Sequence, residues 1–351
     1  VLSSALNLEP VWVLLAIIVF VFGYMMFGGA NSMVYTNAIQ ATLMFIVAVV
    51  LLASGAEFFK DGLSGFREQL RAIGPHYASW TNPDSFLFRD YFEIIFCQVV
   101  IGIAIVCQPH IITKSLLLKD EKDVNRYLVI GIIVIAVFFQ VVFVGLFARL
   151  KFPDLMANGQ AIPMDGIVSA YVVSEFSVYV TILVVLGLIS AGLSTLEGLI
   201  QSLSASLTAD LIKPIFGGRF STDIGRQAKQ EILVNKLVIV FLAVVSFIFS
   251  YQQLVSPNLS VGIFAQNGVY AYFSAAFVPV FFGMFITGVR LQTVFIASVV
   301  AVAVHFSVYY GQFMPYMKET VNNPAIASTV ALLISVSVGL ILHFSGRRSH
   351  V

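Results

Sequence analysis

The sequence predicts an all-α integral membrane protein. Of its 351 residues, 59% are hydrophobic and only 11% are charged, and the mean hydropathy is +0.95, which excludes an ordinary soluble domain. About nine apolar runs are long enough to cross a bilayer as helices. They lack the alternation that is typical of barrel strands, and helices satisfy their own backbone hydrogen bonds in lipid. The lipid bilayer is therefore the first expected partner.

The predicted helices follow one another through short polar connections, apart from one long loop. Their approximate ranges are 10–29, 36–54, 92–113, 127–148, 177–211, 233–251, 261–286, 290–311 and 324–344. The long loop covers residues 55–90, where mixed charge and apolar spacing predict a short amphipathic helix over residues 56–73. We expect one transmembrane domain that takes in the whole chain, residues 1–351.

Positive charges in the loops predict which side of the membrane each loop faces. If residues 114–126 lie in the cytoplasm, strict alternation also places residues 213–236, Arg290 and the tail there. That side then carries 12 of the 19 Lys and Arg residues. We therefore expect a multi-pass protein of the plasma or inner membrane with a cytoplasmic carboxyl terminus. The amino end would start outside and without a methionine, which predicts a chain whose earlier helices are missing.

Charge and motif content exclude several other classes of protein. The net charge of +1 gives no basis for nucleic-acid binding. The sequence shows no Gly-rich nucleotide loop, no pair of catalytic carboxylates and no nucleophile beside a base, and it lacks the His-x-x-Glu spacing of an intramembrane metalloprotease. We therefore expect neither an enzyme nor an organic cofactor.

The fifth predicted helix carries a polar stripe at bilayer depth. Its six members recur at intervals of four and three residues, which places them on one narrow helical face. They are Ser190, Ser194, Glu197, Gln201, Ser204 and Thr208. A charged side chain that faces lipid is unfavourable, so Glu197 is expected to face the bundle interior or a watery cavity. Any single serine is more simply explained by a hydrogen bond to its own helix, but the stripe with its acid favours a functional face.

Three oxygens in the middle of this stripe indicate a bound cation. Where the helix bends or unwinds, the carbonyl of Ala191 and the hydroxyls of Ser194 and Thr195 can converge on one point, and Gly187 and Gly192 would ease the bend. Three neutral oxygens suit a weakly held monovalent cation, such as sodium, better than zinc or calcium. The remaining ligands would have to come from another helix.

Three stretches together resemble the sodium/solute symporter family. The family's helix with an Ala-Gly pair, Ser-Thr and a Thr-x-Asp exit before proline resembles residues 190–214, SAGLSTLEGLIQSLSASLTADLIKP. Its glycine pair followed by Tyr-Thr-Asp-x-x-Gln is similar to residues 28–47, GGANSMVYTNAIQATLMFIV, and its Gln-Pro-His segment to residues 107–126, CQPHIITKSLLLKDEKDVNR. The three stretches occur in the family's order across nearly the whole chain.

The resemblance implies a LeuT-like bundle of inverted repeats that imports a small organic solute with sodium by alternating access. The nine spans would be core helices 4 to 12. Residues 10–54 would end the first repeat, residues 92–286 would form the second, and residues 290–344 would add two helices. The family's first helix, which shares in the sodium and solute ligands, has no counterpart here, so we expect this chain alone not to transport. The motifs resemble the proline, pantothenate and small-carboxylate branches more than the sugar branch.

The resemblance also implies residue roles. It assigns the sodium site to Ala191, Ser194 and Thr195, beside ligands from the family's first helix. The chain has Asn37 where the family usually has Asp. We hypothesise that Glu197 supplies the missing acid and forms a second cation site or a proton-sensitive step. The alternative is that Glu197 is a hydrogen-bonded structural group.

The third predicted helix would open the second repeat and line the solute cavity. Pro109 is expected to break it. The residues that we expect to face the solute are Gln98, Ile101, Gly102, Ala104 and Gln108. Their small and apolar character argues against a sugar, and Gln98 is equally well explained as an interhelical hydrogen bonder.

Several other polar residues have a structural explanation beside a functional one. Tyr270 and Tyr272 could form an outer gate, although aromatic packing is the favoured role. His110 is expected to cap a helix end, and His305 to form a hydrogen bond between helices. Two other functions stay open: a symporter-like sensor, which would need a signalling extension beyond residue 351, and an inactive, truncated transporter.

Overall fold

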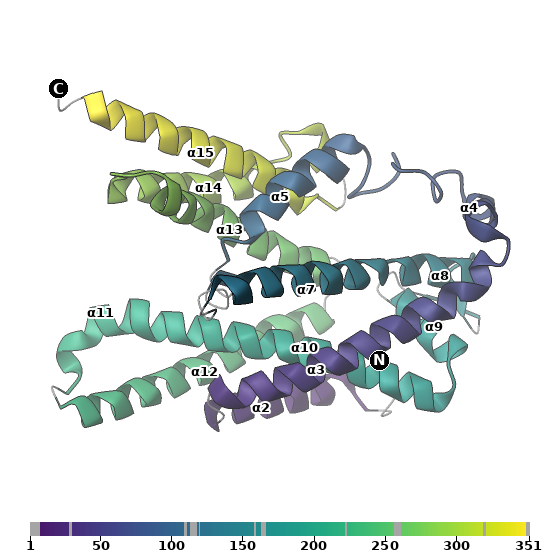
Figure 1. Cartoon of the computed structure of the whole chain (residues 1–351), viewed down its shortest axis with the longest axis horizontal. Helices are drawn as coiled ribbons and strands as arrows, with labels where there is room; N and C mark the ends of the chain where they lie inside the picture. The colour runs from purple at the N-terminus through teal and green to yellow at the C-terminus, as the bar shows by residue number, and fades with distance from the viewer. Residues whose placement is uncertain are drawn as a thin grey trace. The chain divides into compact units, whose positions relative to one another are not determined.

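The protein is described by a computed structural model that covers residues 8–27, 30–108, 111–112, 118, 120–157, 159–162, 166–221, 223–255, 261–318 and 321–348. Eight helices within these residues are long and apolar enough to span a membrane (Figure 1). Pro109 and His110, which the sequence singles out, lie outside the described residues. The predicted all-α membrane fold is confirmed.

The spanning helices match the apolar runs of the sequence. They are α2 (Pro10–Phe27), α3 (Ala30–Ser54), α7 (Glu121–Gln140) continued by α8 (Phe143–Lys151), α10 (Val178–Ser206), α12 (Ile224–Val255), α13 (Val261–Phe285), α14 (Leu291–Gly311) and α15 (Pro324–Arg348). The third predicted span is shorter. It forms a π-helical turn, η2 (Phe92–Cys97), followed by α5 (Gln98–Ile105).

Short elements connect these helices. The long loop contains the 3-10 turn η1 (Gly55–Phe59) and the expected amphipathic helix, α4 (Gly62–Ile73), which buries Phe66 and Leu70. The strands β1 (Met156–Ala157) and β2 (Gln160–Ala161) pair in antiparallel fashion. The remaining elements are α9 (Ile167–Glu175), η4 (Leu207–Ile212), α11 (Lys213–Phe216), η5 (Gly217–Arg219) and η6 (Pro315–Met317).

The first compact unit consists of Val1–Phe66 and Lys122–Asn258. Within it, α10 packs against α2, α3 and α12, and α12 packs against α2 (Figure 1). The close approach of α3 to α10 depends on Gly187, because a Cβ atom there would lie 2.5 Å from the side chain of Val47. The polar stripe of α10 therefore runs beside a tightly packed neighbour.

The second compact unit consists of Arg67–Glu121 and Leu259–Val351. Within it, α13, α14 and α15 pack against one another, and α5 packs against α13 and α15. Small residues at the start of α15, among them Ala325, Ala327 and Ser328, are fully buried and permit close helix packing. Each unit combines segments that are distant in the sequence, and the boundaries of the inverted repeats stay a prediction.

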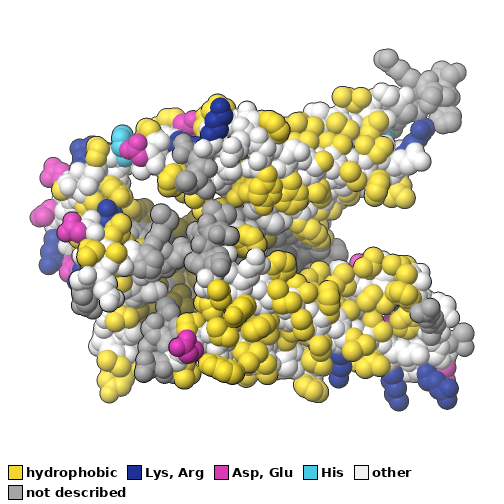
Figure 2. Space-filling view, turned by 180° about the vertical axis from the view of Figure 1, so that it is seen from behind, with side chains coloured by type: hydrophobic (Ala, Val, Ile, Leu, Met, Phe, Trp, Pro, Cys, Tyr) yellow, Lys and Arg dark blue, Asp and Glu magenta, His cyan; other side chains and the backbone are white. Residues whose placement is uncertain are grey.

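Large apolar side chains cover the outer faces of the helices (Figure 2). Phe139 of α7, Leu237 of α12 and Phe295 of α14 are all more than half exposed, and no residue of α7 is buried. Such continuous apolar surface is unfavourable in water. Lipid is the solvent that these faces fit.

Candidate functional site

The polar stripe of α10 points largely into its own unit. Glu197 is 2% exposed, Ser204 2% and Thr208 8%. The prediction that Glu197 avoids lipid and faces the bundle interior is thereby confirmed. Thr208 lies 3.4 Å from the amide oxygen of Asn235 on α12, so the lower end of the stripe also faces a neighbouring helix.

The three oxygens assigned to sodium lie together on α10. The hydroxyls of Ser194 and Thr195 each donate a hydrogen bond of 3.0 Å to the carbonyl oxygen of Ala191. The helix is continuous from Val178 to Ser206, so the oxygens meet without unwinding, because each hydroxyl reaches back by about one turn. A hydroxyl that donates its hydrogen keeps lone pairs for a cation. The chemistry of the donor set therefore fits a share of a sodium site.

Glu197 is the centre of a second polar group, which we call the Glu197 cluster: Tyr24, Gln40 and Glu197, with Asn37 three residues before Gln40 on α3. Tyr24 of α2 donates a hydrogen bond to Oε1 of Glu197. Gln40 of α3 donates a second one to the same oxygen, at 3.2 Å. The other carboxylate oxygen, Oε2, is buried and has no hydrogen-bond partner among the described residues.

Two further oxygens of the cluster are in the same state. Oδ1 of Asn37 and Oε1 of Gln40 are buried without a donor in the part of the chain that the structure describes. The two residues are three positions apart on α3 and so share one face. Each unsatisfied buried acceptor costs about 1–3 kcal/mol. A hard cation, which is ligated by carboxylate and amide oxygens, would relieve each acceptor that it contacts.

The residues expected to line the solute cavity divide between two environments. Ile101 and Ala104 are 3% and 1% exposed and belong to the apolar core of the second unit, together with Phe273. Gln108 is also buried. Gln98 is half-buried and Gly102 is exposed, and a Cβ atom at Gly102 would have no neighbour within 4 Å. Of the five expected residues, Gln98 and Gly102 are the two that are not buried.

The two tyrosines considered for a gate also differ. The ring of Tyr270 lies 5.0 Å from the ring of Phe273 and packs on the core of the second unit. Tyr272 is 57% exposed. His305 of α14 lies 2.8 Å from the amide oxygen of Asn267 on α13, which confirms its predicted hydrogen bond between helices.

The sequence analysis missed a buried ion pair in the second unit. Glu93 is fully buried, and Arg89 donates to both of its carboxylate oxygens, at 2.7 and 3.1 Å. The backbone N–H of Arg89 and the amide of Asn323 donate two more hydrogen bonds. The spacing of four residues between Arg89 and Glu93 is the signal that could have revealed the pair.

A second contact extends this ion pair. The guanidinium of Arg89 lies 4.9 Å from the ring centroid of Tyr316 and donates to the carbonyl oxygen of the same residue. The hydroxyl of Tyr316 donates a 2.6 Å hydrogen bond to Asp90. This bond lowers the pKa of Asp90 below its ordinary value. The start of η2 is therefore tied to the connection between α14 and α15.

Three curated proteins resemble this chain. The sodium/pantothenate symporter of Escherichia coli is 33% identical over 136 residues, which is 38% of this chain and 27% of the symporter. The sodium/pantothenate symporter of Haemophilus influenzae is 28% identical over 40% of this chain and 28% of its own length. The osmoregulated proline transporter OpuE of Bacillus subtilis is 24% identical over 73% of this chain and 48% of its own length. The chain thus spans less than half the length of each relative, and all three come from the branches that the motifs favour.

A solved structure and a family model extend the comparison. The substrate-bound outward-open state of a Na+-coupled sialic acid symporter superposes with a TM-score of 0.68, 17% identity and coverage of 95% of this chain and 67% of that one. The fold is therefore that of a LeuT-like transporter, as predicted. The model of the Sodium:solute symporter family matches residues 1–301. The chain belongs to the sodium:solute symporter family.

Proposed function

We propose that the full-length protein is a sodium-coupled symporter that imports a small organic solute by alternating access. The cell membrane would be its location, with the carboxyl terminus in the cytoplasm. Family membership supports sodium as the coupling ion. The observation that carries the proposal is α10, which holds the three converging oxygens of Ala191, Ser194 and Thr195 and, less than one turn further, a buried acid.

Sodium would bind to Ala191, Ser194 and Thr195 together with ligands from another helix. Because a cation on these oxygens adds contacts in one conformation only, it shifts the population toward that conformation. A solute that binds the same conformation better is then coupled to sodium, and the coupling is reciprocal.

The Glu197 cluster would hold a second cation. A cation can accept lone pairs from Oε2 of Glu197 and supplies the charge that a buried carboxylate needs. Asn37 and Gln40 of α3 carry buried oxygens without a donor among the described residues and would be its neutral ligands.

The solute would meet Gln98 and Gly102 of α5. The relatives are named for pantothenate and proline, so amino acids, carboxylates and vitamin-like acids are the solutes to test first. Uptake by proteoliposomes of the full-length protein should follow an inward sodium gradient and stop when potassium replaces sodium. Uptake of no such solute, in vesicles that hold folded protein, would favour the sensor or the inactive-transporter interpretation.

Sodium binding can be tested before the solute is known. We expect sodium, but not potassium, to raise the melting temperature of the purified full-length protein. Ser194→Ala and Thr195→Ala should each reduce this shift. Ser202→Ala removes a hydroxyl from the same helix outside the stripe, so it is the matched control and should keep the shift. An equal shift in all three variants would reject the proposed site.

A further inference from the structure

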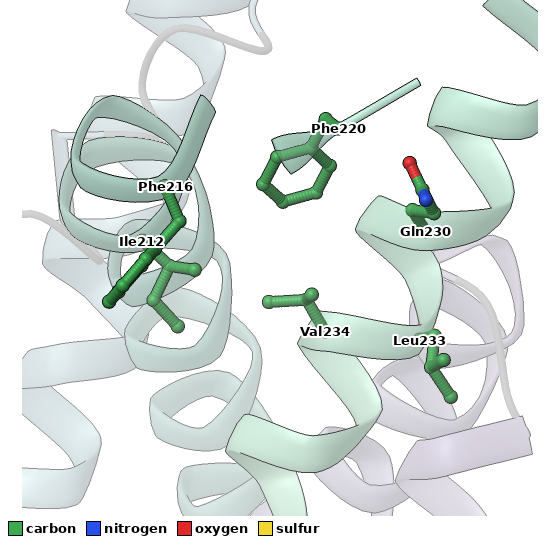
Figure 3. Close-up of a pocket in the computed structure, with 6 residues that line it drawn as sticks. All are labelled: Ile212, Phe216, Phe220, Gln230, Leu233 and Val234. Atoms are coloured by element: carbon green, nitrogen blue, oxygen red, sulfur yellow. The ribbon is translucent and has the colours of Figure 1, made fainter. Parts of the chain in front are cut away.

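A cavity of about 300 Å³ lies between the end of the α10 segment and the start of α12. Its walls come from both sides of the connection between these helices: Ile212, Phe216, Phe220, Gln230, Leu233 and Val234 (Figure 3). Five of these six side chains are apolar, and all six lie in the first unit. A polar solute would find too few hydrogen-bonding groups here.

Polar contacts hold the two walls in place. The backbone N–H of Ser221 donates a 2.8 Å hydrogen bond to Oε1 of Gln230, so the side-chain oxygen of the one polar lining residue is already engaged. Lys213 forms a 2.7 Å ion pair with Glu231, and Gln227 donates to the same carboxylate at 2.9 Å. The contact from Ser221 joins the loop to α12, and the ion pair joins α11 to α12.

The segment that forms the cavity is basic. Residues 213–236 contain five Lys or Arg residues and two acids, a net charge of +3, and Figure 2 shows Lys and Arg side chains at this end of the unit. Arg226 lies one turn before Gln230 on α12, and Lys229 one turn before Leu233; both are exposed. From these two cations to the apolar lining residues Leu233 and Val234 is about two turns of α12.

We propose that this cavity binds an anionic phospholipid, with one acyl chain between Phe216 and Val234 and the headgroup phosphate at Arg226 and Lys229. The sequence of charged, polar and apolar groups along α12 is the order in which a phospholipid presents its own parts. Basic pockets between transmembrane helices are suited to anionic headgroups, and loops of this charge face the leaflet that contains them. The proposal goes beyond solute transport and does not depend on sodium coupling.

Lipid binding can be measured on the delipidated full-length protein in detergent. We expect phosphatidylglycerol to raise the melting temperature at lower concentration than phosphatidylcholine. Arg226→Gln should raise the half-saturating phosphatidylglycerol concentration about fivefold, since one cation near the headgroup contributes about 1 kcal/mol. Val234→Trp should abolish the preference by filling the cavity. Ile232→Trp, which adds the same bulk at an exposed position outside the lining, should leave it intact.

Two further experiments on the wild-type protein test lipid binding if Val234→Trp does not fold. Phosphatidylglycerol with a photoreactive acyl chain should label the wild-type protein on residues 212–220 and 230–234. Glycerol phosphate, which has the headgroup charge without the chain, should give no stabilisation. Labelling spread over all lipid-facing helices, an equal effect of both phospholipids, or full stabilisation by glycerol phosphate would overturn the proposal.

Discussion

The two units each bury a glutamate, and the two residues are satisfied in opposite ways. Glu93 is 0% exposed and Glu197 is 2% exposed. Each carboxylate oxygen of Glu93 accepts two hydrogen bonds. Of these four bonds, Arg89 donates three and Asn323 donates one. Glu197 accepts hydrogen bonds on one oxygen only, and no Lys or Arg among the described residues pairs with it.

We interpret Glu93 as a structural acid and propose that Glu197 is a ligand of a bound cation. A buried carboxylate is stable only when a positive charge and hydrogen bonds compensate for lost hydration. The protein itself supplies both to Glu93. At Glu197 it supplies two neutral donors, and Asn37 and Gln40 of α3 carry buried oxygens without a donor among the described residues. We propose that a bound alkali cation supplies the charge that Glu197 lacks among the described residues.

The largest effect is expected where the chain completes its own ion pair. Arg89→Met leaves Glu93 buried without a counter-charge and should lower the free energy of unfolding by about 3–5 kcal/mol. The loss should be the same in sodium and in potassium, as measured by denaturant unfolding in detergent. Arg89→Met combined with Glu93→Leu should recover much of the stability. A single variant as stable as the wild type would show that the pair is not structural.

Separating α3 from α10 should have the next largest effect. Gly187→Ala places a Cβ atom 2.5 Å from Val47 and should destabilise the protein by about 1–3 kcal/mol, while drawing Gln40 away from Glu197 and weakening the sodium-dependent shift. Gly192→Ala, on the same helix, meets nothing within 4 Å and serves as the control. If both variants behave alike in thermal unfolding with and without sodium, the contact has no role in the cluster.

Neutralising Glu197 should act on the ion more than on the fold. Glu197→Gln keeps the size of the side chain and relieves the uncompensated charge, so stability without sodium should change little. The sodium concentration that half-saturates the thermal shift should rise about tenfold, which corresponds to about 1.4 kcal/mol. Glu93→Gln is the matched comparison in the other unit. It should lower stability and leave the sodium dependence unchanged, and the reverse pattern would contradict the distinction between the two acids.

The smallest effect concerns Asp90, at the edge of the Arg89–Glu93 pair. The hydrogen bond from Tyr316 lowers the pKa of Asp90 in the folded state. Its contribution is therefore complete above the ordinary pKa of about 3.9 and is lost as the pH falls through the lower folded value. Asp90→Asn should cost about 0.5–1 kcal/mol at neutral pH, and the difference should vanish in acid. Tyr316→Phe, which removes the hydroxyl that donates to Asp90, should remove the same pH dependence in thermal unfolding.

The helices could be predicted because a segment that crosses the hydrocarbon core must be apolar along nearly its whole length. Apolar runs locate α2, α3, α10, α12 and their neighbours, and the spacing of the stripe places Glu197 on an interior face. The division of α5 could not be predicted. After Gln98 it has no polar side chain, so periodicity does not separate Ile101 and Ala104, which pack in the core, from Gly102, which does not.

Most hydrogen-bond partners of the two buried glutamates could not be predicted from the sequence around them. Tyr24 and Gln40 are 173 and 157 residues from Glu197, and only the packing of α2 and α3 on α10 brings them together. The Arg89–Glu93 pair does have a local spacing, but it starts in a segment that the sequence presents as a loop. Its distant partner, Asn323, is 230 residues away from Glu93.

Direct sodium binding tests the central claim, that a cation completes the Glu197 cluster. Equilibrium binding of radioactive sodium to the purified full-length protein would compare the wild type with Glu197→Gln and Ser194→Ala at one pH. We predict that Glu197→Gln binds one sodium fewer per protein than the wild type at saturation, and that Ser194→Ala keeps the sodium associated with Glu197. Equal stoichiometry in the wild type and Glu197→Gln would contradict the account and leave Glu197 as a structural acid.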